Sequence, residues 1–321
     1  MNKTKLVVRD LFEAKEAVLS LQLLTPACSL DRPIEAATLA SPGIVLAGFV
    51  DRFLPGRVQV LGETEISFLA SIHPEECRVT LERFLALGMP ALFVTKNLEV
   101  PPVLIEICNK QNVPLFRSPV KTGELYRRLQ PYLEDQLAPT ATLHGSLADV
   151  YGVGLLFMGR SGIGKSECVL DLIERGHRLV ADDMVIAARR GNDLIIGRGP
   201  ELQMHHMEIR GIGIIDIRAL FGIRAIRQQK RIEVIVQLVD LDTSAQYDRT
   251  GLDKIEAEIL GVKIPKVIVP LVAGKNITVI SEIVAMNHLL KYSGVDSAQL
   301  FNERLQAAMR PVRQYLEEDY E

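Results

Sequence analysis

The segment from residue 159 to residue 166 contains the residue types that hold the phosphates of a nucleotide. It fits the pattern G-x-x-x-x-G-K-[ST] without a mismatch. Glycines let successive backbone N–H groups turn toward phosphate oxygens, and a helix that begins there adds the positive end of its dipole. We therefore expect a nucleotide site formed by Gly159, Arg160, Ser161, Gly162, Ile163, Gly164, Lys165 and Ser166.

The last two residues of this segment have chemical roles of their own. The Lys165 ammonium is expected to reach the β- and γ-phosphates, and the Ser166 hydroxyl is expected to bind Mg²⁺. The alternative is a glycine-rich turn that is capped by Ser166 and binds no ligand. The flanking residues argue against it, because an apolar run precedes the segment and an amphipathic run follows it.

Two adjacent carboxylates, Asp182 and Asp183, follow the apolar run Leu179–Ala181. Neighbouring carboxylates repel each other unless a metal or solvent screens them, so the pKa of one of them can be raised. A carboxylate of this kind suits a general base that accepts the proton of a substrate hydroxyl. The alternative is a solvated Asp pair that begins a bend; beside the phosphate-binding segment we favour a functional role.

Polar side chains and glycines also gather between Met204 and Gly213. Glu208 and Arg210 stand out there, because the glycines that follow indicate a close approach of the backbone. The neighbouring pair of histidines is weak support for a metal site, and zinc is not expected. Arg249, in a polar loop farther along the chain, would by itself be an ordinary surface arginine.

These residues require a scaffold of alternating strands and helices. Gly154–Met158 predicts a buried strand, Glu167–Arg175 predicts a helix that ends at a glycine, and Arg178–Ala181 predicts the next strand. Strand, glycine loop and helix in this order is the context that the phosphate-binding pattern requires. Further strands are expected at Met184–Ala188, Asp193–Ile196 and Ile232–Val239, and helices at Glu282–Tyr292 and Ala298–Met309, with a break or restart at Pro311.

The first part of the chain predicts a small α/β unit of its own. Gly43–Val50 and Ala91–Thr95 are expected to be buried strands, Cys77–Leu87 and Pro101–Gln111 helices, and Val113–Phe116 a short strand. This alternation favours a partly parallel sheet covered by helices. No nucleotide fingerprint or catalytic cluster occurs in it.

A helix over Glu124–Gln136 and a polar break at Leu137–Thr140 separate the two parts. We expect an N-terminal α/β domain over residues 1–132 and a catalytic domain over residues 133–321. A length of 321 residues agrees with about two domains.

Composition excludes several classes of protein. A formal net charge of -3 argues against a general nucleic-acid binder. No apolar run approaches the roughly 18–20 residues that span a bilayer, and no secretory signal is apparent, so we expect a cytoplasmic protein without a membrane partner. The scattered cysteines indicate reduced thiols in or near the core rather than disulfides or a zinc site: Cys28, Cys77, Cys108 and Cys168.

Residues 133–321 resemble the bacterial HPr kinase/phosphorylase family, which phosphorylates a serine of the phosphocarrier protein HPr and can reverse the modification. The resemblance depends on motifs in a fixed order. These are His144-Gly145, Gly159 to Glu167, Leu179 to Asp183, Glu208 to Ile215, Asp248-Arg249, and Pro270 to Asn287. The first part of the chain fits the family in size and α/β character and carries no matching motif.

The resemblance implies a set of roles, with ATP and Mg²⁺ as cofactors. Lys165 and its loop would hold nucleotide phosphates, while Ser166 and Glu208 would bind Mg²⁺. Asp183 would accept the serine proton in phosphorylation and return it when inorganic phosphate attacks phosphoserine and forms pyrophosphate. His144 would lie near this carboxylate, and Arg249 near the transferring phosphoryl group.

The resemblance also implies a fold and an assembly: a variant P-loop kinase domain shared with phosphoenolpyruvate carboxykinase, and a homohexamer. Residues 207–216 and 270–275 would correspond to the segments for catalysis and for dephosphorylation. Ala273 and Lys275 stand where the family is expected to have Pro and Arg. Arg and Lys are not equivalent at a bidentate phosphate contact.

Three other readings remain open on the residues alone. A small-molecule kinase and a nucleotidase would need the same loop and acids, although no guanine-reading N-K-x-D motif supports a GTPase. A binding protein with a degenerate loop is the third, and the intact Lys165, Ser166, Asp183 and Glu208 argue against it.

Overall fold

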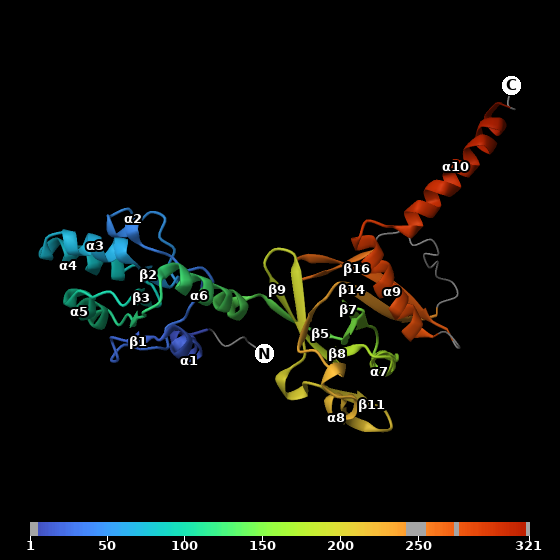
Figure 1. Cartoon of the computed structure of the whole chain (residues 1–321), viewed down its shortest axis with the longest axis horizontal. Helices are drawn as coiled ribbons and strands as arrows, with labels where there is room; N and C mark the ends of the chain where they lie inside the picture. The colour runs from blue at the N-terminus through green and yellow to red at the C-terminus, as the bar shows by residue number, and fades with distance from the viewer. Residues whose placement is uncertain (1–5, 242–254, 273–275, 319–321) are drawn as a thin grey trace. The chain divides into compact units, whose positions relative to one another are not determined.

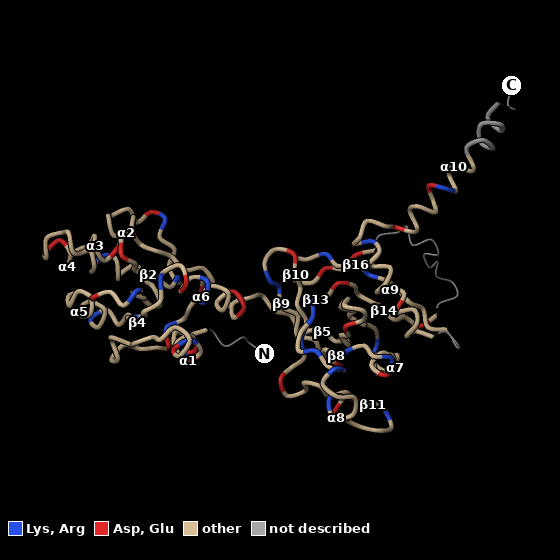
Figure 2. The backbone as a smooth tube through the Cα atoms, viewed as in Figure 1, with Lys and Arg blue, Asp and Glu red and all other residues tan. Residues whose placement is uncertain are grey.

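The structure is a computed structural model that describes residues 6–241, 255–272 and 276–318, the last nine by their backbone alone. Its contacts divide the chain into two compact units, Met1–Ala138 and Pro139–Glu321 (Figure 1). Each unit has buried apolar clusters of its own. Helix α6 runs to Leu137, past the domain boundary expected at residues 132 and 133. In both units Lys and Arg are interspersed with Asp and Glu (Figure 2).

The N-terminal unit is a four-stranded sheet with helices packed against it, in the order β1-β4-β3-β2. Strands β2, β3 and β4 are parallel and β1 is antiparallel to β4, so the predicted partly parallel sheet is confirmed. The elements are α1 Val8–Leu19, β1 Gln22–Leu23, α2 Gly43–Leu46, β2 Gln59–Leu61, α3 Glu63–Ser71, α4 Pro74–Leu85, β3 Leu92–Val94, α5 Pro102–Lys110, β4 Leu115–Arg117 and α6 Thr122–Leu137.

One strand predicted in this unit is wrong. The run from Gly43 to Val50 forms the short helix α2 and a turn at Gly48, whose φ of 106° favours glycine. Only some of its apolar side chains are buried: Leu46 is buried, whereas Ile44 is 71% exposed and Phe49 is 54% exposed. A short apolar run does not by itself distinguish a strand from a helical turn.

The C-terminal unit is built around a six-stranded sheet in the order β15-β16-β14-β7-β6-β8. Strands β7, β14 and β16 are parallel, so their carboxyl ends lie at one edge of the sheet. The elements of the sheet and its first helix are β6 Ser146–Val150, β7 Val153–Met158, α7 Lys165–Glu174, β8 Arg178–Ala181, β14 Val234–Asp240, β15 Glu256–Ile259 and β16 Val262–Leu271.

The strand after α7 was expected to be the next strand of the unit. Strand β8 does follow α7 in the chain, but β6 lies between β7 and β8 and is antiparallel to both. All five residues of β6 are buried, because apolar clusters pack on both faces of this strand. This insertion places Ser146, the first residue of β6, beside the end of β8.

Two further sheets lie in this unit. One has the order β13-β10-β9-β5, and the other is the hairpin of β11 and β12. The remaining elements are β5 Thr140–His144, β9 Met184–Arg190, β10 Leu194–Arg198, the 3₁₀ turn Glu201–Gln203, β11 His206–Ile209, β12 Gly213–Asp216, α8 Ile217–Phe221, the 3₁₀ turn Ile223–Ala225, β13 Gln229–Arg231, α9 Ile277–Tyr292 and α10 Ser297–Glu318.

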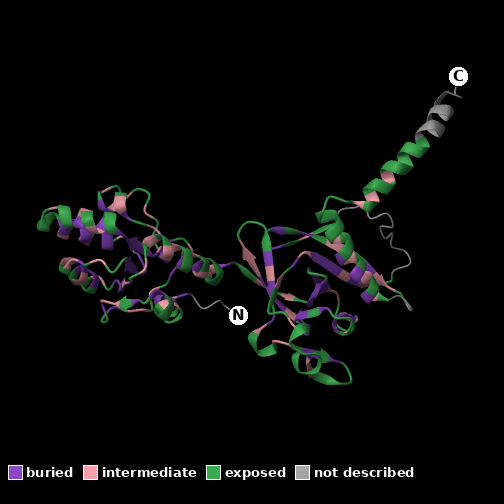
Figure 3. Ribbon diagram, viewed as in Figure 1, coloured by how far each residue is buried: buried purple, intermediate pink, exposed green. Residues whose placement is uncertain are grey.

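The C-terminal helices differ from their predicted limits. Helix α9 begins at Ile277, five residues before Glu282, because Asn276 caps it by accepting from the Val279 amide at 3.1 Å. Helix α10 continues through Pro311, so the break expected there is wrong. The described side chains of α10 are mostly exposed, whereas strands β6, β7 and β14 of the central sheet are largely buried (Figure 3).

Candidate active site

The phosphate-binding segment leaves the central sheet at the carboxyl end of β7 and enters α7. Gly159 lies so close to β14 that a Cβ there would stand 2.7 Å from the Leu238 carbonyl oxygen. Gly164, at φ 101°, is the cap residue from which α7 begins. Glycine is required at both places, for space at the first and for a left-handed backbone at the second. The predicted strand, loop and helix are confirmed.

The Lys165 side chain folds back over this loop. Its Nζ donates to the carbonyl oxygens of Gly159 and Arg160, at 3.2 Å in each case. The ammonium is therefore held above the concave backbone rather than extended into solvent. This is the position from which a lysine can contact phosphates that the loop binds.

Arg160, in the middle of the loop, pairs with the end of β14. Its guanidinium donates to both carboxylate oxygens of Asp240, at 2.6 and 2.8 Å. The hydrogen bonds and charge of Arg160 lower the pKa of Asp240. Both side chains are more than 60% exposed, so solvent screens the pair and its contribution to stability is small.

Asp182 joins the loop helix to the end of β8. Its Oδ1 accepts from the Ser166 hydroxyl at 3.0 Å and from the Ser146 hydroxyl at 2.6 Å. Burial raises the pKa of this carboxyl, and hydrogen bonds from the two serines and from the backbone amides of Asp183 and Glu208 oppose the rise. Repulsion between the two carboxylates was expected to raise the pKa of one of them; the pKa of Asp182 is raised, but the cause is burial.

Asp183 lies in a different environment although it is the next residue. It is exposed and takes a left-handed backbone with φ 61°, which turns the chain from β8 into β9. Its carbonyl oxygen accepts from the Gly145 amide at 3.0 Å. The structure thus separates the pair into one buried carboxylate that anchors Ser166 and one exposed carboxylate able to meet a substrate.

His144 is placed beside Asp183 by strand pairing. It ends β5 and stands opposite Met184 in β9, the residue after Asp183, and its side chain is exposed. The next residue, Gly145, has no room for a side chain, because a Cβ there would collide with the Phe157 carbonyl oxygen in β7. The pairing of His144 with Met184 and the hydrogen bond from the Gly145 amide to the Asp183 carbonyl oxygen place the backbones of His144 and Asp183 on adjacent strands.

The hairpin of β11 and β12 borders the loop from another direction. Met207 and Ile209 are buried in the core that also contains Phe157 and Ile163, so the intervening Glu208 points out of that core and is exposed. The Glu208 amide reaches the Asp182 carboxylate. This position brings Glu208, predicted as a metal ligand, close to Ser166.

Arg210, just after β11, lies against the phosphate loop. A Cβ on Gly162 would come within 2.5 Å of both terminal nitrogens of its guanidinium. A second positive charge therefore stands beside the loop with Lys165. The sequence pattern singled out Arg210 without assigning it a role.

For the remaining predicted residues, the structure describes only the strands that precede them in the chain. Arg249 lies outside the described residues, as do Ala273 and Lys275. Strands β14 and β16, which precede these two gaps, end at Asp240 and Leu271, which pair with each other at the edge where β7 ends. Both strands therefore end at the edge of the sheet that carries the phosphate loop.

The residues present fit a Mg²⁺ ion. Within the described ranges there is no cluster of three or more His, Cys, Asp or Glu that would form a protein cage for a metal. Mg²⁺ does not require one, since it commonly takes one or two protein oxygens together with phosphates and waters. The Ser166 hydroxyl, whose proton points to Asp182, keeps its lone pairs for a cation.

Sequence reasoning missed Ser146 and the role of Asp182 as an anchor. A serine at the start of a strand gives no signal by itself, and its contact with Asp182 exists only because β6 is inserted between β7 and β8. The cysteines were predicted correctly: all four are free and buried. None of the described helices is long and apolar enough to cross a membrane.

Comparisons with known proteins show which family the chain resembles. Family models described as HPr Serine kinase N terminus and HPr Serine kinase C-terminal domain match residues 6–133 and 135–305. An HPr kinase/phosphorylase of Chloroherpeton thalassium is 42% identical over 100% of this chain and 98% of its own length. Another, of Geobacillus kaustophilus, is 46% identical over 90% of this chain and 93% of its own.

A solved structure, the Hpr(Ser) kinase/phosphatase from Coxiella burnetii, is 36% identical and covers 51% of this chain and 99% of its own, with a TM-score of 0.45. The two family models together cover most of the chain, and the curated relatives match it over nearly its full length. The chain belongs to the HPr kinase/phosphorylase family.

Proposed function

We propose that this enzyme transfers the γ-phosphoryl group of ATP to a serine of HPr and removes it again by phosphorolysis. The observation that carries the proposal is the contact of Ser166 with Asp182, which joins the phosphate loop to the acidic strand end. Through this contact a nucleotide on the loop and the exposed carboxylate of Asp183 belong to one site. The printed names of the curated relatives support HPr as the protein substrate.

In the forward direction the serine oxygen attacks the γ-phosphorus while the bond to the β-phosphate oxygen breaks. Asp183 is the proposed acceptor of the serine proton, because it is exposed beside the loop. Lys165 would neutralise charge on the β- and γ-phosphates, and Arg249 would do so on the transferring group. His144, held beside Asp183 by strand pairing, would orient that carboxylate.

In the reverse direction an oxygen of inorganic phosphate attacks the phosphorus of phosphoserine, and pyrophosphate forms. Asp183 would then return its proton to the departing serine oxygen, because the base of a forward reaction is the acid of its reverse. Residues 207–216 would serve catalysis and 270–275 dephosphorylation, as the resemblance implies. The family is expected to have Arg at the position of Lys275. This difference concerns the reverse reaction, because the lysine ammonium is a single compact charge, whereas the arginine guanidinium can donate two parallel hydrogen bonds to a phosphate.

Mg²⁺ is the proposed metal cofactor, with Ser166 and Glu208 as its protein ligands. Bound there, it would withdraw charge from the phosphates during transfer. The fold proposed for the C-terminal unit is the variant P-loop kinase domain that phosphoenolpyruvate carboxykinase also has. The proposed assembly is a homohexamer, and light scattering on the full chain measures its mass directly.

The test is intact-mass measurement of HPr after incubation with the enzyme, Mg²⁺ and ATP. One phosphoryl group on one serine is the expected result, and Lys165→Ala should reduce the rate by at least about 100-fold. ATP consumption with no mass change on HPr would instead support a nucleotidase or a kinase for another acceptor. Activity unaffected by Lys165→Ala would overturn the assignment of the loop.

A further inference from the structure

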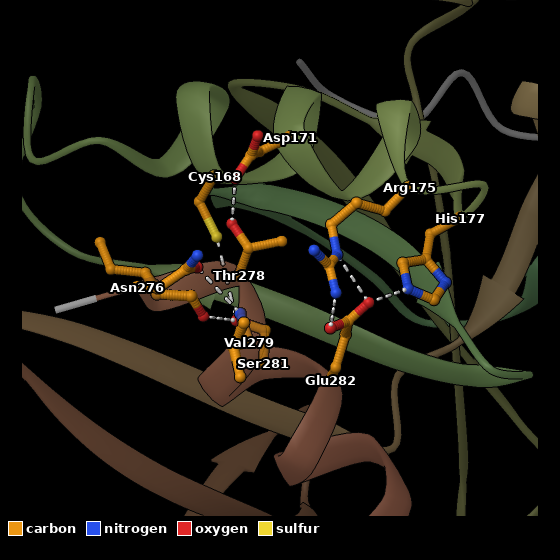
Figure 4. Close-up of polar contacts among 10 residues, drawn as sticks. Cys168, Asp171, Arg175, His177, Asn276, Thr278, Val279, Ser281 and Glu282 are labelled. Carbon is orange, nitrogen blue, oxygen red and sulfur yellow. Dashed lines mark hydrogen bonds and ion pairs between the residues drawn. The ribbon is translucent and has the colours of Figure 1, made fainter.

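Helix α9 lies along the phosphate-loop helix α7 and is joined to it at two points one helical turn apart. Near the start of α9, the Thr278 hydroxyl donates to Asp171 at 2.6 Å (Figure 4). One turn later, the Glu282 carboxylate accepts hydrogen bonds from Arg175 and from His177, which follow the last residue of α7. Since 171 and 175, like 278 and 282, are four residues apart, the contacts match turn for turn.

Glu282 makes the stronger of these contacts. Its side chain is 7% exposed, and its two oxygens accept from Arg175 Nε at 2.9 Å and Nη2 at 2.7 Å. His177 Nε2 lies 3.1 Å from the same carboxylate. The hydrogen bonds of Arg175 lower the pKa of Glu282. A buried carboxylate held by a two-pronged guanidinium has a single favourable geometry.

The inward face of α9 is unusual in its composition. Its fully buried positions are Thr278, Ser281, Glu282 and Ala285, whereas Ile283 is 55% exposed. An amphipathic helix normally buries its apolar stripe. In α9 the apolar Ile277, Ile280 and Val284 are only partly buried against the core, whereas the central contacts with α7 are polar and directional. Such contacts define the register between two helices, which apolar packing alone specifies less strictly.

Both helices begin beside the phosphate loop. A cavity of about 380 Å³ lies elsewhere in the unit, but one of about 550 Å³ separates the starts of α7 and α9 and is lined by Gly164, Glu167, Asn276 and Ile277 among others. Strand β16, which precedes α9 in the chain, ends at the edge where β7 ends. Any shift of α9 along α7 therefore moves the entry to α9 relative to the phosphate loop.

We propose that Glu282 is a positioning residue for phosphoryl transfer, which acts through Arg175 and His177 to hold α9 in register with the phosphate-loop helix. It touches no substrate. Its effect is on the start of α9, where Asn276 and Ile277 line the same cavity as Gly164 of the phosphate loop. The inference rests on the proposed function, because it concerns the rate of the same transfer.

The experiment compares Glu282→Gln with wild type in the full-length enzyme, using HPr phosphorylation by intact mass and ATP affinity by calorimetry. The expected result is a fall in kcat of about 10- to 100-fold, because small displacements of catalytic groups have effects of this size. The dissociation constant for ATP should change less than about threefold, since Glu282 contacts neither the loop nor Lys165. Glu282→Asp, which keeps the charge, should recover part of kcat.

Glu106→Gln is the matched control, because Glu106 accepts from both prongs of Arg78, at 2.8 and 2.9 Å, in the N-terminal unit. It should leave kcat and ATP affinity as in wild type. If Glu282→Gln does not fold, Thr278→Val removes the other contact with nearly the same shape and should lower kcat with ATP affinity retained.

Wild type without activity toward HPr would refute the proposed function itself. With active wild type, a folded Glu282→Gln enzyme of unchanged kcat would overturn the positioning role. The positioning role would also be overturned if Glu282→Gln lost kcat and ATP affinity to the same extent, or if the Glu106→Gln control lost as much kcat as Glu282→Gln. Each of these results is expected of a general loss of stability.

Discussion

At the scale of single residues, two neighbouring aspartates differ in burial and therefore in role. Asp182 is 7% exposed, and its carboxylate accepts hydrogen bonds from the hydroxyls of Ser146 and Ser166. Asp183 is exposed and has a left-handed backbone conformation. The sequence predicted the pair and its place after a strand. It could not predict which carboxylate is buried, because that depends on the contact between β6 and β8, which residue spacing does not encode.

Asp183→Asn is expected to lower the rate of HPr phosphorylation by about 10²- to 10⁴-fold, since the amide cannot accept the serine proton. ATP affinity should remain within about twofold of wild type, because the loop and Lys165 are untouched. Rate and ATP binding are measured on the same preparation. Asp51→Asn, an exposed site in the N-terminal unit, is the control. A large loss of ATP binding in Asp183→Asn would contradict the role of this residue.

Asp182→Asn tests the buried carboxylate through the pH dependence of stability. Folding raises the pKa of Asp182, so folding favours its protonated form. Its contribution to stability is fully present below the ordinary Asp pKa of about 4 and is lost as pH rises through the higher pKa of the folded state. Asn cannot ionise, so the Tm of the variant relative to wild type should increase over this pH range, measured without metal or nucleotide. A difference that falls with pH would contradict the assignment.

At the scale of elements, the sequence pattern correctly predicted the structures that depend on residues close together in the chain. The strand, loop and helix from Val153 to Glu174 were predicted from glycine spacing and apolar periodicity, and the structure agrees. The insertion of β6 between β7 and β8 was not predicted, because strand order depends on contacts distant in the chain. The start of α9 at Ile277 was missed because Asn276 was not recognised as its N-terminal cap.

Close packing of strands at the site gives a prediction for Gly145. A Cβ at this position would collide with the Phe157 carbonyl oxygen, whereas a Cβ at Gly123 in α6 would meet nothing within 4 Å. Gly145→Ala should lower the free energy of unfolding by about 1–3 kcal/mol and reduce the rate of phosphorylation. Gly123→Ala should be neutral or stabilising by up to about 1 kcal/mol. Chemical denaturation compares the two, and equal effects would show that β6 and β7 have room to separate.

At the scale of the whole molecule, the candidate site belongs to one of the two units. Every described residue assigned to it lies after Pro139, and the N-terminal unit contributes none. The predicted α/β character of both parts is confirmed, and the relatives support the family over the full chain. What the N-terminal unit adds was not predicted, because its sequence carries packing residues and no chemistry-bearing motif.

A chain that begins at Ala138 tests this division. It keeps Pro139, whose carbonyl oxygen accepts from the Arg189 amide at 2.9 Å, and it keeps both apolar clusters of the C-terminal unit. We expect it to fold and to phosphorylate HPr within about tenfold of the full-length rate, because interfaces between domains of one chain are commonly modest. Activity is compared at equal concentrations of folded protein. A folded but inactive fragment would place an essential part of the site in the N-terminal unit.

The most direct test of the account is the reverse reaction. HPr phosphorylated on one serine is incubated with the enzyme, Mg²⁺ and inorganic phosphate, and pyrophosphate is measured together with the mass of HPr. The account predicts one pyrophosphate for each serine restored, no reaction without added phosphate, and loss of the reaction in Asp183→Asn. Release of inorganic phosphate with no pyrophosphate would mean that water is the attacking group, and it would contradict a single reversible site for phosphoryl transfer.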